Sequence, residues 1–375
     1  MVPHIRSPQT RLLIAWLVII ALLITLGIIF IYSSSSIFAM EHYHEPHYFV
    51  LKQLMGLIIG LGGLVICRRI PFHTIQRFSP YLFLAAAGIT ALTLVPQLGV
   101  MIHGSRRWIA IAGISFQPSE FLKIAFIIYL AYILTKKQYH VRSFMYGYAP
   151  FLLIIGITAI ILLQQPDFGQ AITLGITAFM LFFIAHIHLA YLVGTLALVF
   201  PLIGVLIYFK PYRFQRILIF LNPWKDPQGA GFQIIQSLIA IGSGNVTGVG
   251  IAQSKQKFFY LPMQHTDFIF SIIAEETGFI GSCVIIFLYC SFLVVGLKLA
   301  TKISERFSCY LILGYIFLVT IQAIMNICVT TGLLPTKGLG LPFISFGNSA
   351  LIAHLCMIGV IINAVHASHA STTSL

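Results

Sequence analysis

Charged residues, and acidic residues above all, are scarce in this chain. Its 375 residues include nine Asp and Glu, and Asp, Glu, Lys and Arg together make up 8% of the sequence. Soluble domains carry about 25% charged residues, so the composition excludes a water-soluble globular enzyme. Hydrophobic residues form 59% of the chain and the mean hydropathy is +0.97, which indicates a protein that lies largely within a membrane.

Other features that the sequence lacks narrow the class of protein further. The six cysteines form no Cys-x-x-Cys pair, so the sequence supports neither a disulfide framework nor a zinc site. The alternating apolar pattern of a membrane β-barrel is also missing. The net charge of +13 is not gathered in a separate basic domain, which argues against nucleic acid as a partner. We therefore expect part of this charge to meet anionic lipid headgroups.

Ten apolar stretches are close to the ~20 residues that cross a bilayer as a helix. Lys and Arg gather between them on one side, which predicts a cytoplasmic N-terminus and, with an even number of spans, a cytoplasmic C-terminus. The sequence thus predicts an all-α polytopic membrane protein with one domain, residues 1–375. The expected spans are 11–32, 49–67, 80–96, 117–134, 147–164, 168–186, 189–209, 266–297, 308–329 and 348–366.

One connection, about residues 210–265 between the seventh and eighth spans, is far longer than the others and is expected to be extracytoplasmic. Loops of this length are usually functional or disordered. Residues 232–241 predict a short amphipathic helix inside it. The glycine-rich run 242–250 lacks the Gly-Lys-Ser/Thr ending of a phosphate loop, so it predicts tight backbone turns.

Asp267 is the most informative acid, because it stands at the mouth of the eighth span. A carboxylate at the rim of a lipid-buried helix is costly unless it is used or paired. Ser271 and Glu275 follow one and two turns later, so we expect them on a similar face. Helix capping is the alternative role for Asp267, as it is for His265 and Thr266.

Polar groups also precede the fourth span. Arg106 and Arg107 suit headgroup anchoring, yet a forked guanidinium also suits a diphosphate. Glu120 and Lys123 are three residues apart and are expected to pair on one helical face. A structural ion pair and a substrate-site role are equally compatible with that spacing.

Two more polar segments fall on the same expected face. Asp167 lies in a turn between the fifth and sixth spans, where capping of the following helix is favoured over direct catalysis. Residues 335–349, which include Lys337 and Ser345, carry two prolines and several glycines before the last span. Irregular backbone at membrane depth is tolerated when it is buried in protein or lines a polar cavity. Four polar segments on one face predict a site there.

In this order, these motifs resemble the SEDS family (shape, elongation, division and sporulation), which includes FtsW, RodA and SpoVE. The resemblance covers essentially the whole chain. It rests on GSRRWI from Gly104, QPSEFLK from Gln117, QQPDFGQ from Gln164, LPMQHTDFIFSIIAEETGFIG from Leu261 and PTKGLGLPFISFGNSAL from Pro335.

The resemblance implies a ten-helix fold and a glycosyltransferase that polymerises lipid II into peptidoglycan. It places the family's essential acid at Asp267 and the Glu and Lys of its QPSE-x-x-K motif at Glu120 and Lys123. Thr336-Lys-Gly338 is similar to the division-type FtsW branch. Phe346 in place of Tyr and Asn348 in place of Gly leave the subtype open.

On this basis we expect Asp267 to act as the general base in a single inverting displacement. The leaving diphosphate would be stabilised by positive charge from one of two sources. One is the side chains of Arg106, Arg107, Lys123 and Lys337; the other is a divalent cation, Mg or Mn, held partly by Asp267.

The resemblance also implies a multi-pass protein of the bacterial inner membrane at the division septum. Its expected partners are a class B penicillin-binding transpeptidase and other division or elongation membrane proteins. The alternatives are a RodA-like elongation polymerase, a lipid II flippase and a structural scaffold. Broken helices beside a cavity would favour the flippase.

Overall fold

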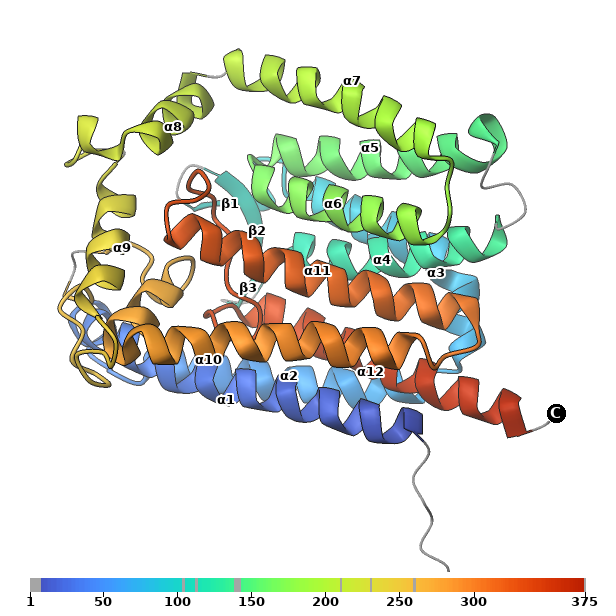
Figure 1. The fold of residues 1–375 in the computed structure, drawn as a ribbon, viewed down its shortest axis with the longest axis horizontal. Helices are drawn as coiled ribbons and strands as arrows, with labels where there is room; N and C mark the ends of the chain where they lie inside the picture. Colours follow the sequence, from blue (N-terminus) through green and yellow to red (C-terminus); the bar gives the residue numbers. More distant parts are fainter. Residues whose placement is uncertain are drawn as a thin grey trace, which may run out of the picture.

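The computed structural model describes residues 8–102, 105–111, 114–137, 143–209, 211–229, 231–258 and 261–373. The helices are α1 (Pro8–Tyr43), α2 (Tyr48–Arg69), α3 (Phe72–Leu92), α4 (Pro118–Lys136), α5 (Ala149–Gln164), α6 (Phe168–Ile184), α7 (Leu189–Tyr208), α8 (Pro211–Leu221), α9 (Phe232–Ser243), α10 (Ile269–Ala300), α11 (Arg306–Thr330) and α12 (Asn348–Thr373). Most of them run roughly along one long axis, whereas α9 runs across it (Figure 1).

Within the described residues, seven helices are long and apolar enough to cross a membrane: α1, α2, α4, α5 with the π-turn before it, α10, α11 and α12. This identifies a multi-pass membrane protein. The other three expected spans correspond to α3, α6 and α7, which lie alongside the rest (Figure 1). A membrane-crossing role for these three, and so the count of ten, stays a prediction.

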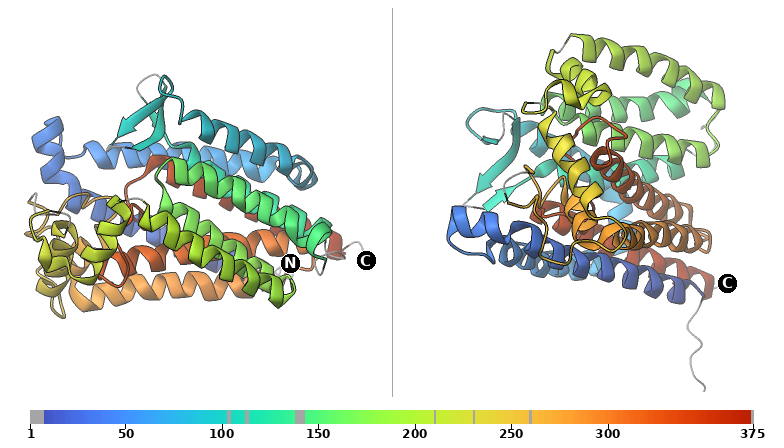
Figure 2. Two further views of the ribbon diagram at one scale, coloured as in Figure 1. Left: turned by 90° about the horizontal axis from the view of Figure 1, so that it is seen from above. Right: turned by 60° about the vertical axis from the view of Figure 1, so that its left-hand side comes forward.

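The two ends of the bundle differ. α1 begins and α12 ends at the same end, shown at the right of Figure 1 and again in Figure 2. The opposite end carries α8, α9 and the strands. The segment 232–241, expected as an amphipathic helix, is found in α9, which spans Phe232–Ser243.

The expectation of an all-α protein was wrong at that end, because a small antiparallel sheet lies before α4. Its strands are β1 (Gly99–Ile102), β2 (Ser105–Ile111) and β3 (Ile114–Phe116), in the order β1-β2-β3. β-Branched and aromatic residues recur along it, which favours strands. Each strand is short and lies between apolar spans, so hydropathy alone does not reveal it.

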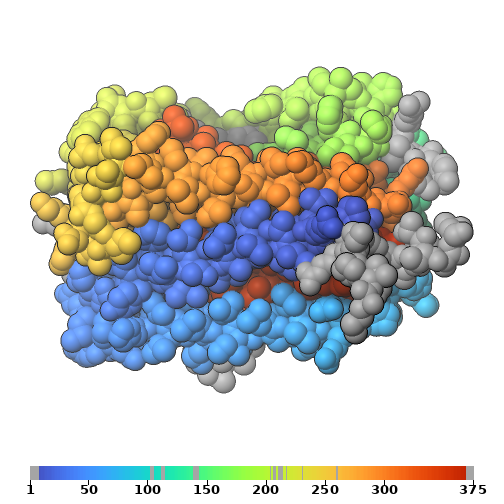
Figure 3. Space-filling model, turned by 60° about the horizontal axis from the view of Figure 1, so that its bottom comes forward, coloured from blue at the N-terminus to red at the C-terminus, as the bar shows by residue number. Residues whose placement is uncertain are grey.

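The core is centred on α11, which packs against α4, α6, α10 and α12. Trp16 of α1 lies between Phe292 of α10 and Tyr315 of α11, with ring centroids 5.1 and 6.1 Å away. On the outside, α1 runs between α10 and α2, as Figure 3 shows. The segments before α10 and after α11 are therefore held close together by tightly packed helices.

The glycine-rich run forms tight turns, as predicted, and it is inserted into a break in α10. The helix is interrupted at Gly278, where φ is +66° and ψ is −160°. The segment 245–250 takes up the backbone groups freed by this break: it receives hydrogen bonds from two amides of α10 and donates two to the carbonyls of Glu275 and Glu276. At Gly248, φ is +81°, and a Cβ there would overlap the Glu276 carbonyl. The long loop is thereby fixed to the start of α10.

Candidate active site

Asp267 lies in the turn before α10, at the end of the bundle that carries the strands. It does not cap α10: the N-cap position is Phe268, which makes no side-chain capping bond. Asn326 of α11 donates one hydrogen bond to the Asp267 carbonyl at 2.7 Å and another to the Leu339 carbonyl at 2.6 Å. These bonds hold the acid between α11 and the 331–347 segment, with part of the residue still exposed.

Arg107 approaches from the sheet. The β1–β2 register shifts so that Arg106 pairs with Met101 and Trp108 with Val100, which leaves Arg107 as the extra residue of a bulge. Bulges commonly redirect a side chain next to a functional site. Arg107 makes an ion pair with Asp167. The structure therefore gives Arg106 and Arg107 different contacts, although nothing in the sequence distinguishes them.

The Arg107 guanidinium is clamped onto the turn between α5 and α6. It donates from Nε to the Gln165 carbonyl at 3.0 Å and from Nη2 to the Pro166 carbonyl at 2.7 Å. Its Nη1 lies 3.3 Å from Asp167 Oδ2. This three-point contact fixes the plane of the guanidinium, because both carbonyls and the carboxylate belong to one rigid turn.

Asp167 has two contacts. Its Oδ1 accepts a hydrogen bond from the Gln170 amide at 3.2 Å and so caps α6, the role favoured from the sequence. Its Oδ2 faces Arg107. Burial raises the pKa of Asp167, and Arg107 and the Gln170 amide act in the opposite direction. One carboxylate therefore orders both the helix start and the arginine beside Asp267.

Asp267 is influenced electrostatically by the same groups. Burial raises its pKa to about 7; the Asp167 carboxylate adds to this rise, whereas Arg107 and Arg216 lower the pKa. Gly338 packs beside them: a Cβ there would be 3.4 Å from Asp267 Oδ2 and 3.8 Å from Arg107 Nη1. A carboxylate with a pKa near neutrality, beside fixed cations, has the properties of a general base.

Two further cations, one on the 331–347 segment and one on α8, are found near Gly338. The Lys337 ammonium lies over the Phe168 ring, 5.7 Å from its centroid, and burial lowers the pKa of Lys337 to about 8. Arg216 of α8 donates from Nη1 to the Thr336 carbonyl at 2.8 Å. The sequence analysis missed Arg216, because a single arginine within a long loop carries no motif; its presence in the loop before Asp267 was the one available signal.

Glu120 and Lys123 form the predicted ion pair, 2.8 Å apart and buried. Gln170 of α6 donates to Glu120 Oε1 at 2.8 Å, and Lys123 donates to Gln322 Oε1 of α11 at 3.3 Å. Gln322 in turn donates to the Gly340 carbonyl at 2.9 Å. The pair thus joins α4, α6 and α11 and supports the 331–347 segment from below.

His265 and Thr266 directly precede Asp267, and Ser345 of the 331–347 segment contacts Thr266. The His265 ring is buried against Phe49 at 4.4 Å and Phe346 at 5.9 Å between centroids. Burial lowers the pKa of His265 to about 4, so the ring is neutral at pH 7. Ser345 donates to the Thr266 carbonyl at 2.5 Å. These contacts fix the residues directly before Asp267.

Ser271 and Glu275, expected on a face similar to that of Asp267, both contact the long loop. Ser271 shares a hydrogen bond of 2.6 Å with Ser237 of α9, and Glu275 accepts one of 2.5 Å from Ser254. The regular helix begins at Ile269, so both residues lie within α10 and Asp267 precedes it. Both residues anchor the long loop, and their sharing a face with Asp267 stays a prediction.

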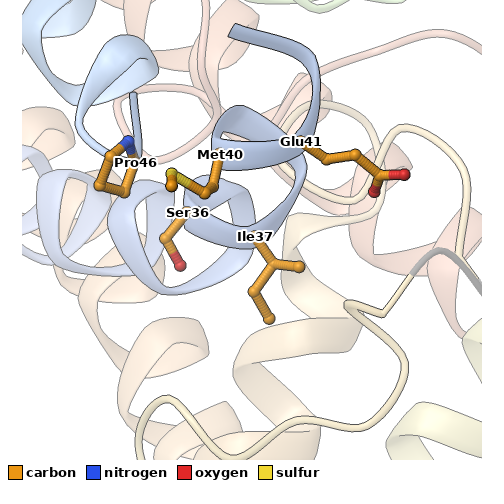
Figure 4. A pocket seen from close by; sticks show the side chains of 5 residues that line it. All are labelled: Ser36, Ile37, Met40, Glu41 and Pro46. Atoms are coloured by element: carbon orange, nitrogen blue, oxygen red, sulfur yellow. The ribbon is translucent and has the colours of Figure 1, made fainter. Parts of the chain in front are cut away.

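A separate hollow of about 440 Å³ lies near the C-terminal end of α1 (Figure 4). Its lining is Ser36, Ile37, Met40, Glu41 and Pro46. It contains one acid and no basic side chain, so it is not suited to a diphosphate. It is therefore not part of the candidate site around Asp267.

The described residues contain no group of three or more His, Cys, Asp and Glu side chains arranged to hold a metal ion. Asp167 and Asp267 supply two carboxylates, and two guanidinium groups compete for them. The protein alone therefore does not provide the oxygen-rich shell that Mg²⁺ prefers. A divalent cation would need oxygen atoms from a bound substrate.

The helical bundle defines a polytopic membrane protein, and the half-buried acid among cations at one end is a candidate acid–base site. The sequence model of the FtsW/RodA/SpoVE family, described as cell cycle proteins, matches residues 14–370. The chain belongs to this family.

Two curated relatives cover nearly the whole chain. The probable peptidoglycan glycosyltransferase FtsW of Geobacter sp. (strain M18) is 40% identical over 347 residues, 92% of this chain and 95% of the relative. Stage V sporulation protein E of Bacillus subtilis (strain 168) is 38% identical over 362 residues, 95% of this chain and 96% of the relative.

Solved structures agree with this assignment. A chain of a peptidoglycan synthase complex that coordinates polymerization and crosslinking has a TM-score of 0.77 and 29% identity, over 94% of this chain and 97% of that chain. The rod shape determining protein RodA of Thermus thermophilus has a TM-score of 0.70 and 23% identity, over 94% of this chain and 95% of that chain. This second likeness concerns the fold alone.

Proposed function

We propose that the chain is a peptidoglycan glycosyltransferase that polymerises lipid II into glycan strands during cell division. The observation that carries the proposal is Asp267, a carboxylate with a pKa of about 7 beside fixed guanidinium groups. The relatives named as FtsW glycosyltransferases support the reaction and favour the division-type branch over the RodA-like branch. No contact described above favours a flippase.

In the proposed reaction, the hydroxyl oxygen of an acceptor sugar attacks the anomeric carbon of the donor. The bond from that carbon to the diphosphate oxygen breaks, and the undecaprenyl diphosphate leaves with the bonding electron pair. Asp267 takes the hydroxyl proton as the new bond forms. One displacement inverts the anomeric centre, so an α-linked diphosphate yields a β-linked glycan.

The leaving diphosphate requires positive charge that is in place before the reaction. Arg216 and Lys337 lie on or beside the 331–347 segment near Asp267 and are our leading candidates. Arg107 is engaged by two backbone carbonyls and by Asp167, so we assign it to fixing Asp167 and lowering the pKa of Asp267. Lys123 is buried against Glu120 and supports the site from below.

We infer that any divalent cation, Mg or Mn, would bind together with the substrate diphosphate. Asp267 and Asp167 would supply protein oxygens to it. The test is polymerisation after treatment with a chelator, followed by addition of Mg²⁺ or Mn²⁺ to the wild type and to Asp167→Asn protein. Full activity in excess chelator would contradict a cation requirement.

We place both chain ends in the cytoplasm and the strand-bearing end, with the 210–265 loop, outside. Basic residues at the other end support this orientation, among them Arg68, Arg69, Lys298 and Lys302. Lipid II would then be used in the outer leaflet of the inner membrane, at the division septum. The complex named above supports a class B penicillin-binding transpeptidase as a partner.

The proposal is tested by polymerisation of lipid II with the purified chain, with and without that transpeptidase. Asp267→Asn should abolish glycan formation, because the amide cannot accept the proton and the shape is kept. Glu41→Gln is the matched control, since it removes an exposed acid in the last turn of α1 and should leave output unchanged. Near-normal glycan output from correctly inserted Asp267→Asn protein would refute the assignment.

A further inference from the structure

A basic hollow lies at the end of the bundle remote from Asp267, between the start of α3 and the end of α4. These two helices pack along each other, and both of these ends lie on the side where α1 begins (Figure 1). The hollow measures about 500 Å³. It is lined by His73, Gln76, Arg77, Tyr132, Thr135 and Lys136.

The lining is suited to an anion. It contains two permanent cations, one histidine, three uncharged polar side chains and no carboxylate. No ion pair found in the described part of the chain involves Arg77 or Lys136. An arginine fork and a lysine ammonium are the two side-chain groups that most often bind phosphate.

Lys136 is directed by its neighbour. Its ammonium lies over the Tyr132 ring, 5.6 Å from the centroid, and donates to the Tyr132 hydroxyl at 3.4 Å. A lysine that extended freely into water would make neither contact. The amine therefore lies beside Tyr132, and both residues line the hollow together with Arg77 of α3.

An apolar path leads from the hollow along α3. Arg77, Tyr81 and Leu84 are spaced i, i+4 and i+7, so they share one helical face. Tyr81 is 66% exposed and Leu84 is 63% exposed, whereas Phe83 of the same helix faces the bundle and is buried. A cationic end followed by an apolar stripe matches a molecule with an anionic head and a hydrocarbon tail.

We propose that this hollow binds the phosphate-bearing headgroup of an anionic phospholipid, with an acyl chain lying along the exposed face of α3. General attraction of basic residues to a membrane surface would act without a shaped site. Here two cations on different helices converge on one hollow that continues into an apolar stripe. The ligand chemistry, a phosphate ester, could also be satisfied by free phosphate, which the experiment must distinguish.

The test is native mass spectrometry of the full chain in a neutral detergent, titrated with phosphatidylglycerol or phosphatidylcholine. The wild type should bind the anionic lipid at least about tenfold more tightly than the zwitterionic one, since each basic residue near a lipid surface contributes about a fivefold factor. Arg77→Gln/Lys136→Gln should remove that preference. Arg77→Lys, which keeps the charge and loses the fork, should retain part of it.

The matched control is Lys298→Gln/Lys302→Gln, which removes two exposed lysines at the same end of the bundle. It should bind phosphatidylglycerol as the wild type does. Equal losses in the two double variants would overturn the proposal in favour of unspecific attraction. Displacement of the lipid by millimolar inorganic phosphate, or an unchanged preference after Arg77→Gln/Lys136→Gln, would also overturn it.

Discussion

The ionisation of Asp267 should set the pH dependence of polymerisation. With a pKa of about 7, the side chain is about 90% ionised at pH 8, about half ionised at pH 7 and about 10% ionised at pH 6. If the carboxylate is the general base, kcat/KM should fall about tenfold between pH 8 and pH 6. An aspartate near the ordinary value of 3.8 would give a flat profile over this range.

Two substitutions should shift the acid limb of the pH–rate profile, the fall of kcat/KM towards low pH, in opposite directions. The Arg216 cation lowers the pKa of Asp267, so Arg216→Gln should raise the pKa and shift the limb to higher pH. The Asp167 carboxylate raises the pKa, so Asp167→Asn should shift the limb to lower pH. An asparagine oxygen can still accept the Gln170 amide, which keeps the cap of α6.

The assay is glycan formation from lipid II by reconstituted protein between pH 6 and pH 9 at constant ionic strength. A loss of rate above about pH 8 is expected as well, because the pKa of Lys337 is about 8. Lys337→Arg should remove that basic limb, since arginine stays charged. A flat acid side, or shifts of the same sign in Arg216→Gln and Asp167→Asn, would refute Asp267 as the base.

Two further predictions concern stability, measured as thermal unfolding of the purified protein in detergent. Lys123→Met leaves Glu120 buried and unpaired, which should cost about 3–5 kcal/mol, and Glu120→Gln/Lys123→Met should cost less than the sum of the single changes; additive losses would argue against the pair. Gly248→Ala places a Cβ against the Glu276 carbonyl at positive φ and should destabilise by about 2 kcal/mol or more. Gly156→Ala is the control and should be neutral or stabilising, because its Cβ would meet nothing within 4 Å. Equal melting temperatures for the two alanine variants would contradict the close contact between Gly248 and the break in α10.

The long apolar segments could be located from the sequence because one physical quantity, transfer into lipid, decides their position. The span expected at 117–134 is α4, Pro118–Lys136, and the span expected at 308–329 is α11, Arg306–Thr330. Proline at the first position of α4 also marks its start. Local signals of this kind also predicted the capping contact of Asp167.

Contacts between distant segments were beyond the sequence. Arg216 meets the Thr336 carbonyl across 120 residues, and no spacing rule links two such positions. The sheet was missed because its strands are short and have no hydropathy signal of their own. The hydrogen bond between Ser271 and Ser237 of α9 spans 34 residues, and no local pattern links these two positions. In each case tertiary packing, not local preference, determines the arrangement.

The contacts of Arg107 with the 165–167 turn determine which cations of the site can bind the leaving diphosphate. A guanidinium that binds a diphosphate with two parallel hydrogen bonds needs two free N–H groups on one edge. Nε and Nη2 of Arg107 already donate to the carbonyls of the 165–167 turn, and Nη1 faces Asp167. Arg107 is therefore better suited to fix Asp167 and tune the pKa of Asp267 than to grip the leaving group. Lys337 and Arg216, which donates from Nη1 to the Thr336 carbonyl, remain our candidates for that task, and the proposed diphosphate would then lie near the 331–347 segment.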